Sequence, residues 1–166
     1  MRAQELIDIL RLQRHPEGGW YREVFRSAAQ VDPLLDRPKR DALTSIYFLL
    51  EAGQQSRWHR VLSDEVWVHL EGAPITLWTW DAVLRTAPVS TCLGPVDADG
   101  TRPQHVVPAG QWQAARPIAA HGSGDFSLAA CMVAPGFDFA DFSFMTPGGE
   151  EGAVLRQHWP ELGELI

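Results

Sequence analysis

The stretch that decides the fold runs from residue 53 to residue 72 and reads GQQSRWHRVLSDEVWVHLEG. A glycine stands at each end, and the residues between are rich in Val, Leu, Trp and other strand formers. His59 lies six residues after the first glycine, and Glu65 lies six residues after His59. Runs of this kind, bounded by Gly, Ser and Asp, predict two short β-strands at 56–61 and 65–71 joined by a turn.

Similar short runs continue on both sides of this stretch. They cover residues 20–25, 43–50, 75–80, 90–93, 104–107, 112–115 and 126–133. Many short strands at near-regular spacing, without helices between them, predict a sandwich or a closed barrel.

The segments between and beside the strands are predicted to be helical or irregular. Residues 3–13 carry apolar side chains at helical spacing, which predicts a short N-terminal helix that ends before the Pro and Gly residues of HPEGG, 15–19. Residues 28–41 are rich in Pro and charge and are predicted to be a loop. Residues 154–159 could form a helical turn.

Composition limits the classes of function. The chain has 166 residues, enough for one domain, 1–166, with a substantial core. The formal charge is −7 and Lys39 is the only lysine, which disfavours nucleic-acid binding because a phosphate backbone needs a basic face. Cys92 and Cys131 match neither a zinc cluster nor a disulfide framework. No stretch approaches the roughly 20 apolar residues of a membrane span, and no signal peptide is recognisable, so we expect a cytoplasmic protein.

The spacing around His59 resembles the first motif of the cupin family. In that motif a Gly precedes a His-x-His pair by six residues, and a Glu and a second Gly follow. Gly53, His59, Glu65 and Gly72 match these positions, and Val61 replaces the second His. The second cupin motif, Pro-x-Gly with a His three residues on, is matched by PAG at 108–110, with Gln113 at the His position.

Longer segments narrow the resemblance to one branch of the family. They are HPEGGWYRE (15–23), LTSIYFLL (43–50), HR (59–60) with DEVW (64–67), PAGQWQ (108–113) and APGFDFADF (134–142). On these segments the chain is identified as a member of the cupin-5 family, domain of unknown function 985, over a core of about residues 5–145, followed by a tail, 146–166. One departure is that Val68 stands directly after Trp67, so that the histidine follows at His69.

The resemblance implies an architecture and no particular reaction. It implies an all-β jelly-roll barrel, the cupin double-stranded β-helix, that is usually a homodimer. It is similar in shape to nucleotide-sugar epimerases that act on dTDP-4-keto sugars. The seven Trp and seven Phe residues would suit an apolar dimer interface as well as a ligand pocket.

Three side chains are the candidates for catalysis. His59 and Glu65 are expected to meet across neighbouring strands, where the carboxylate would orient the imidazole and stabilise its charged form. Tyr47, on the strand 43–50, could present its phenol to the cavity as a proton donor. The alternatives are a buried His59 that is satisfied structurally and a Tyr47 packed on the outer face.

Five more side chains are candidates for ligand binding. Gln113 offers an amide donor and acceptor. Glu65, Trp67 and His69 should share one strand face, which would bring Trp67 and His69 toward the cavity. Trp112 could stack on a ligand, and Arg22 could hold an anionic group. The alternatives are core packing for the tryptophans and for His69, and a solvated face for Arg22.

The other histidines and two aspartates are assigned no catalytic or binding role. His15, His105, His121 and His158 lie in loop-like or terminal contexts. Asp138 and Asp141 alternate with phenylalanines and are interpreted as the outward residues of an aromatic strand.

A metal would depend on His59, Glu65 and Gln113. Glutamine oxygen suits hard cations better than the zinc, iron or nickel that imidazoles hold, and tight transition-metal sites use three or four good ligands. We therefore expect no cofactor, with a divalent metal as the alternative.

Three functions remain open. The favoured one is an epimerase or isomerase that uses acid–base chemistry on a small polar molecule, sugar-like or keto. The second is a non-catalytic module that binds a metabolite. The third is a metal-dependent oxygenase or lyase with a reduced ligand set.

Overall fold

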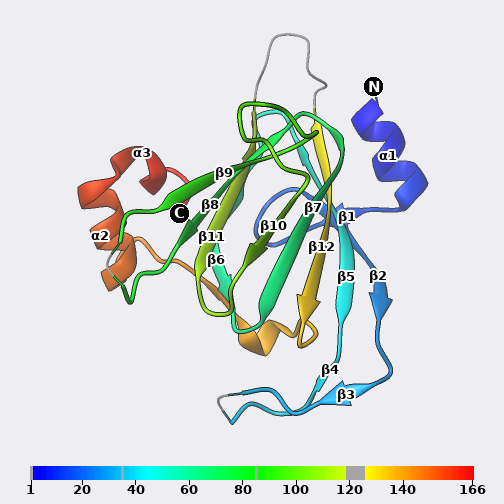
Figure 1. The fold of residues 1–166 in the computed structure, drawn as a ribbon, viewed down its shortest axis with the longest axis horizontal. Coiled ribbons are helices and arrows are strands. Elements are labelled where there is room, and N and C mark those ends of the chain that lie inside the picture. The colour runs from blue at the N-terminus through cyan, green and yellow to red at the C-terminus, as the bar shows by residue number, and fades with distance from the viewer. Residues whose placement is uncertain (1, 35, 85, 119–125) are drawn as a thin grey trace.

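The computed structural model describes residues 2–34, 36–84, 86–118 and 126–166, and its strands form two main sheets (Figure 1). The six-stranded sheet has the order β1 (Gln13–Arg14), β2 (Trp20–Arg26), β5 (Thr44–Glu51), β12 (Phe126–Ala134), β7 (Asp64–Gly72) and β10 (Gln104–Val107). The five-stranded sheet has the order β13 (Phe142–Phe144), β6 (Ser56–Val61), β11 (Trp112–Pro117), β8 (Ile75–Trp80) and β9 (Val89–Leu93). Neighbouring strands are antiparallel. The predicted all-β barrel is confirmed.

Every predicted strand is present, within two residues at either end. The predicted N-terminal helix is α1 (Arg2–Leu10), which ends three residues earlier than predicted, because Gln13 and Arg14 form β1. The prediction of a loop over 28–41 is partly wrong, because this segment contains β3 (Gln30–Val31) and β4 (Arg40–Asp41), which pair with each other. Strands as short as these, β1 and β13 leave no periodic pattern to detect. The chain ends in α2 (Glu150–His158) and α3 (Pro160–Gly163).

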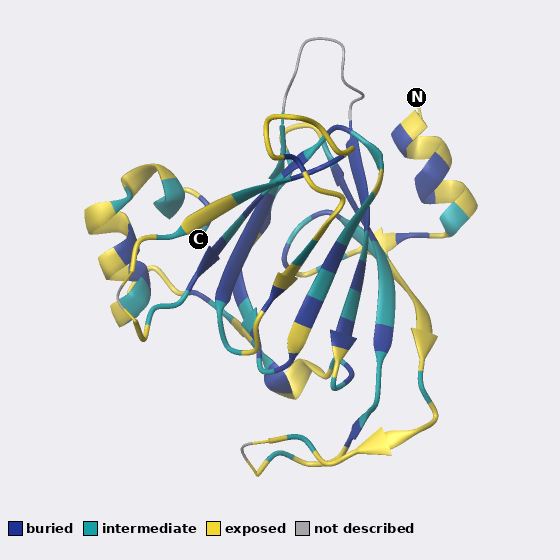
Figure 2. Ribbon diagram, viewed as in Figure 1, coloured by how far each residue is buried: buried dark blue, intermediate teal, exposed yellow. Residues whose placement is uncertain are grey.

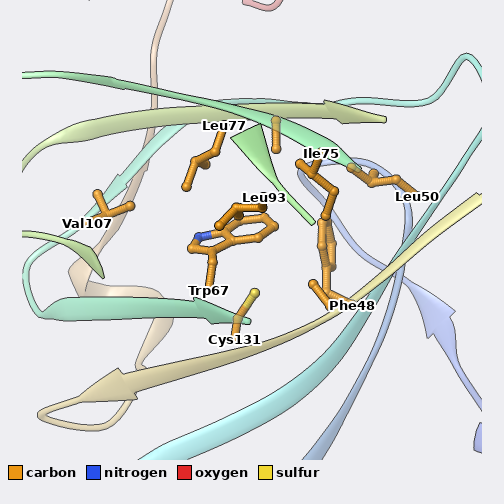
Figure 3. Packing of buried hydrophobic residues seen from close by; sticks show 10 residues of the cluster. Phe48, Leu50, Trp67, Ile75, Leu77, Leu93, Val107 and Cys131 are labelled. Atoms are coloured by element: carbon orange, nitrogen blue, oxygen red, sulfur yellow. The ribbon is translucent and has the colours of Figure 1, made fainter. Parts of the chain in front are cut away.

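The barrel interior is packed at one end. Strand β5 shows why, because its alternate residues point inward: Phe48 and Leu50 join a buried cluster around Trp67 that also takes in residues of the second sheet, such as Leu77. Figure 3 shows these side chains directed toward one another between the strands. Fully burying a side chain of this size contributes about 1.5–3 kcal/mol, so this end of the barrel forms the stable core.

The opposite end of the interior is hollow. The next inward residues of β5, Thr44 and Ile46, line a cavity instead of the core. On β7 the inward residues likewise pass from the packed core, at Trp67, to the cavity, at Glu65. The strands thus place polar side chains in a sheltered space whose floor is the packed core.

The helices cover the outside of the barrel. Leu6 and Ile7 of α1 pack with Leu49 and Leu128 on the outer face of the six-stranded sheet. On the other side of the barrel, α2 and α3 pack against the five-stranded sheet (Figure 1). Strand β2 lies near the edge of the six-stranded sheet, and most of its residues are exposed (Figure 2).

Candidate functional site

The cavity between the sheets has a volume of about 500 Å³, in the size range of small-molecule sites. Strands β1, β2, β5, β7 and β12 line one side of it, β6 and β13 line the other, and two loops complete it. The residues that line it are Gln13, His15, Glu17, Tyr21, Glu23, Arg26, Thr44, Ile46, His59, Val61, Glu65, Cys131, Val133, Phe137, Asp138, Phe139 and Phe142.

His59 lies in this cavity in close contact with Glu17. Its side chain is 2% exposed, and its Nδ1 lies 2.7 Å from the backbone oxygen of Arg57. Because a carbonyl oxygen can only accept, Nδ1 carries the proton and Nε2 is the free acceptor of the neutral ring. Glu17 Oε2 lies 3.2 Å from Nε2, so a protonated Glu17 donates to the ring.

The pKa values of this pair are shifted in the direction that keeps both groups neutral. Burial raises the pKa of Glu17 to about 8, although a hydrogen bond from Ser56 and the charge of Arg57 act in the opposite direction. Burial also lowers the pKa of His59. The two groups therefore share one proton near neutral pH, and they titrate as a unit.

Glu65 is the second buried carboxyl group. Gln113 Nε2 donates to its Oε2 over 2.6 Å, while Trp67 Nε1 donates to Gln113 Oε1 over 2.9 Å. Burial raises the pKa of Glu65 to about 7; His59 and the bonds from Gln113 and Cys131 oppose that rise. A carboxyl group that titrates near pH 7 can serve as base or acid under physiological conditions.

The HPEGG loop brings Glu17 and His15 into the cavity. Gly18 has φ +113°, and a Cβ there would collide with the backbone oxygen of Gln55, so only glycine fits. Arg57 N donates to the Glu17 backbone oxygen over 2.9 Å, which fixes the loop to β6 beside His59. His15 packs edge-on against Tyr21, and burial lowers the pKa of His15 to about 4.

Aromatic side chains form one wall of the cavity. Phe137, Phe139 and Phe142 pack edge to face, and Phe142 also stacks on the His59 ring at 5.4 Å. Asp141 anchors this segment, since its carboxylate accepts from Arg40 Nε over 2.8 Å and from Arg37 Nη1 over 3.0 Å. The interpretation of Asp138 and Asp141 as outward strand residues is wrong, because Asp138 lines the cavity and Asp141 is buried in a short 3-10 turn, Phe139–Asp141.

Two of the candidate catalytic residues, His59 and Glu65, line the cavity as predicted. The predicted contact between them across neighbouring strands is wrong, because β6 and β7 belong to different sheets and Glu17, not Glu65, contacts the imidazole. Tyr47 does not line the cavity. It points to the outer face of β5 and packs with the cluster beneath α1, because its neighbour Ile46 takes the inward position. The phenol at the cavity belongs instead to Tyr21.

The candidate ligand-binding residues lie in several places. Trp67 and Gln113 are buried behind Glu65 and hold it, so they support the site without lining the cavity. His69 lies further along β7, on the far side of Trp67, where its Nε2 is 3.1 Å from the Ala73 oxygen. The prediction that His69 points toward the cavity is wrong, because the packed core around Trp67 lies between His69 and the cavity.

Trp112 and Arg22 point away from the cavity. Trp112 lies on the outer face of the five-stranded sheet. Arg22 bonds to the Leu10 oxygen over 3.1 Å on the outside of β2. A bulge in β2 between Glu23 and Phe25 then reverses the alternation, so that Arg26 lines the cavity and Phe25 is exposed.

Sequence reasoning missed Glu17, His15 and Tyr21. All three lie in HPEGGWYRE (15–23), which was used to identify the family and to end the N-terminal helix but not as a source of site residues. A charged residue beside paired glycines in a loop was the available signal, since loops that carry buried polar groups often serve function. His121, which was assigned no role, lies outside the described residues.

The residues at the cupin motif positions, His59, Val61, Glu65 and Gln113, do not form a set of metal ligands in this structure. Val61 has no donor atom, and both ends of the Gln113 amide are already hydrogen-bonded. The free nitrogen of His59 faces Glu17. Over the described ranges, no group of three or more His, Cys, Asp and Glu side chains is arranged to hold a metal ion.

A barrel of two facing antiparallel sheets with a polar cavity at one end is the architecture of the cupin superfamily. Residues 4–145 match the family Cupin superfamily (DUF985), so the chain belongs to that family. A hypothetical protein from Leishmania major shares 34% identity, with a TM-score of 0.82 and coverage of 99% of this chain and 96% of that one.

Two further structures are similar to this one. Protein SO0799 from Shewanella oneidensis shares 33% identity, with a TM-score of 0.80 and coverage of 99% and 94%. A cupin 2 domain-containing protein from Halorhodospira halophila shares 15% identity, with a TM-score of 0.56 and coverage of 93% and 86%, which shows the fold alone. Among proteins of curated function, none matches the sequence. None of the helices in the described ranges is long and apolar enough to cross a membrane.

Proposed function

We propose that this protein is an enzyme of the epimerase or isomerase class that moves protons on a small polar carbonyl compound, sugar-like or keto, in the barrel cavity. One observation supports it above the others. Glu65 and the Glu17–His59 pair are buried, line one cavity, and have carboxyl pKa values raised to about 7 and about 8. Titratable groups with such perturbed pKa values, gathered in a cleft, are typical of catalytic sites.

The chemistry needs a base and an acid on one substrate. Glu65, when ionised, removes a proton from the carbon next to the carbonyl. The Glu17–His59 pair gives its shared proton to the carbonyl oxygen, so that a neutral enol forms, Glu65 becomes protonated and the pair becomes negatively charged. Protonated Glu65 then returns its proton to the neighbouring carbon, which isomerises the substrate, or to the opposite face of the same carbon after the enol has turned over in the cavity, which epimerises it. The hydroxyl group that becomes the carbonyl returns its proton to the pair and completes the cycle.

Glu65 and the Glu17–His59 pair have different hydrogen-bond partners, and these partners suit Glu65 to act as the base and the pair to act as the acid. Gln113 donates to Glu65 and so stabilises the ionised form that a base requires. The Arg57 oxygen holds the Nδ1 proton of His59, which leaves Nε2 to exchange a proton with Glu17. The aromatic wall of Phe137, Phe139 and Phe142 would hold the apolar face of the substrate and exclude water.

Solvent deuterium exchange tests this proposal. Keto sugars and small hydroxy ketones are incubated with the protein in heavy water, and loss of the proton signal on the carbon next to the carbonyl is followed by NMR. We expect exchange with at least one compound, lost in Glu65→Gln and in Glu17→Gln. Glu71→Gln is the matched control, because Glu71 pairs with Arg2 on the surface. A wild-type protein that exchanges none of the compounds contradicts the proposal.

A binding function without turnover is the second candidate. The aromatic wall favours it, because three phenylalanines can hold a ring without any proton transfer. Mass spectrometry of the denatured protein would show a metabolite that co-purifies. A metabolite that is released unchanged after long incubation at neutral pH supports binding over catalysis.

We also propose that the protein is a cytoplasmic homodimer joined along β2. Beyond Tyr21 the outer edge of β2 has no strand partner among the described residues, since β1 pairs only with Trp20 and Tyr21. Phe25 on this strand is 51% exposed. An open edge with an exposed aromatic side chain is suited to pair with a second copy. Sedimentation velocity of the wild type and of Phe25→Glu tests it: a wild-type monomer contradicts it.

A further inference from the structure

A second hollow lies outside the barrel, between the five-stranded sheet and α2. We call it the Trp112 groove; it has a volume of about 680 Å³. The register places Arg60, Trp112 and Trp80 directly opposite one another on β6, β11 and β8. These three residues form a row across the outer face of the sheet, and Trp159 packs against Trp80 at 6.0 Å.

The groove contains two buried donors that have no acceptor. Trp112 is 4% exposed, yet its Nε1 has no hydrogen-bond partner, and neither has Nε of Arg60. The other buried tryptophans of the described chain differ: Trp58, Trp67 and Trp80 each donate from Nε1 to an oxygen. A buried donor without an acceptor is costly, so a ligand oxygen that reached both N–H groups would be favoured.

The two unpaired donors, Nε1 of Trp112 and Nε of Arg60, lie on side chains that pack against each other. The Arg60 guanidinium carbon lies 4.6 Å from the centre of the Trp112 ring, so the cation covers the face of the indole. Arg60 is only partly buried, and Glu151 lies 4.0 Å from its Nη1. This side chain can therefore move outward and expose the Trp112 ring to a ligand while its own N–H groups remain available.

The charge of the groove restricts the ligand. Asp81, Glu150 and Glu151 line it together with one guanidinium, that of Arg60, which disfavours anions. Carboxylates accept from hydroxyl groups, the Trp112 and Arg60 N–H groups donate to them, and indole faces pack on apolar ring surfaces. We propose that the Trp112 groove binds a neutral sugar ring, at a site separate from the barrel cavity.

The two sites are on opposite faces of the same strand pair. His59 and Gln113 are paired residues of β6 and β11 that point into the barrel, whereas Arg60 and Trp112 are the next pair and point out. The proposal is thus independent of the reaction in the cavity, and a variant that inactivates the cavity leaves the groove intact.

Indole N–H signals in NMR spectra test the proposal directly, with the Trp112 signal assigned from its loss in Trp112→Phe. The probes are glucose, galactose, N-acetylglucosamine, maltose, cellobiose and lactose, up to roughly 20 mM, well above a millimolar Kd. We expect at least one sugar to shift the Trp112 signal saturably. Affinity measured by calorimetry should fall at least about tenfold in Trp112→Phe and several-fold in Arg60→Lys, which keeps the charge and loses the Nε donor.

Two variants serve as controls. Trp78→Phe removes an indole from the same strand as Trp80 outside the groove, and Glu65→Gln alters the cavity; both should bind the sugar as the wild type does. The proposal is overturned if no sugar shifts the Trp112 signal, or if Trp112→Phe and Arg60→Lys bind as tightly as the wild type. It is also overturned if the signal shifts with protein concentration alone, since a second copy would then cover the groove.

Discussion

Replacement of Glu17 by Gln tests the buried acid directly through the pH dependence of stability. Burial raises the pKa of Glu17 from 4.5 to about 8 and that of Glu65 from 4.5 to about 7. A carboxyl group with a raised pKa in the folded state stabilises the fold while it is protonated. Its contribution is therefore fully present below pH 4.5 and is lost as the pH rises through the folded pKa.

The buried histidines act in the opposite direction over a lower pH range. Burial lowers the pKa of His15 from 6.5 to about 4 and also lowers the pKa of His59. Their contributions are present above pH 6.5 and are lost as the pH falls. Between pH 4.5 and 6.5 the two histidines thus act against the two carboxyl groups, and above pH 6.5 the carboxyl groups dominate.

The magnitude follows from proton counting. Between pH 7 and pH 8, folded Glu17 goes from about nine-tenths to about half protonated while the unfolded chain has lost this proton, so Glu17 lowers the free energy of unfolding by about 1 kcal/mol. In Glu17→Gln this contribution disappears, because the amide cannot ionise, and only the smaller fall from Glu65 remains. The amide N–H group also preserves the hydrogen bond to His59 Nε2, so the two proteins should have similar stability near pH 6.

Urea unfolding at half-unit steps from roughly pH 6.5 to 8.5 provides the measurement. Glu71→Gln is the control: Arg2 lowers the pKa of exposed Glu71, so this variant should keep the fall of the wild type. A wild-type stability that stays constant or rises across this range refutes the reasoning, as does a Glu17→Gln protein that shows the same fall.

Four further predictions concern the loop, the support of Glu65, the reaction and the metal. Gly18→Ala should lower the free energy of unfolding, measured in urea, by at least about 2 kcal/mol, because the added Cβ collides with the Gln55 backbone oxygen. Gly53→Ala should lower it by only about 1 kcal/mol, because Gly53 also has a positive φ but has open space around it. Equal effects of the two substitutions would contradict the role assigned to Gly18 in the HPEGG loop. Trp67→Phe should lower the free energy of unfolding by at least about 1–3 kcal/mol, because the buried Gln113 Oε1 loses its hydrogen-bond donor. A variant as stable as the wild type would show that this hydrogen bond does not stabilise the fold. Glu65→Gln should slow deuterium exchange at least about 100-fold at pH 7, with the circular dichroism spectrum unchanged; retained exchange would exclude Glu65 as the base. Protein purified without a histidine tag should contain less than about a tenth of an equivalent of transition metal by mass spectrometry and gain no activity when metal is added; stoichiometric metal would overturn the reading of the ligand positions.

Local patterns predicted most of the fold because strand formation leaves a strong local signature. Alternating and β-rich runs such as 56–61 and 75–80 appear in the structure with their predicted bounds. Two-residue strands such as β3 and β4 carry too few residues to show a pattern. The exchange of Phe25 and Arg26 between outer face and cavity was unpredictable for another reason, because the bulge in β2 depends on its pairing with β5.

The candidate site was only partly predictable. The motif positions led to His59 and Glu65, which line one cavity from opposite sheets, although the direct contact expected between them is made by Glu17 instead. Tyr47 was a wrong choice because alternation along a strand leaves two faces, and nothing in its local sequence says which one the core will cover. Glu17 was missed because its place beside His59 depends on a glycine turn that folds back onto β6.

The sequence by itself determined the strands, the family and two residues of the site, His59 and Glu65. Each of these follows from the spacing of residues over short stretches of the chain. Only the tertiary structure decided which half of the barrel interior is solid and which is hollow, because that depends on how side chains from both sheets fill a shared volume. It also decided that Glu17 faces the free nitrogen of His59. Burial and long-range contacts set the protonation of that pair, and neither quantity exists in the unfolded chain.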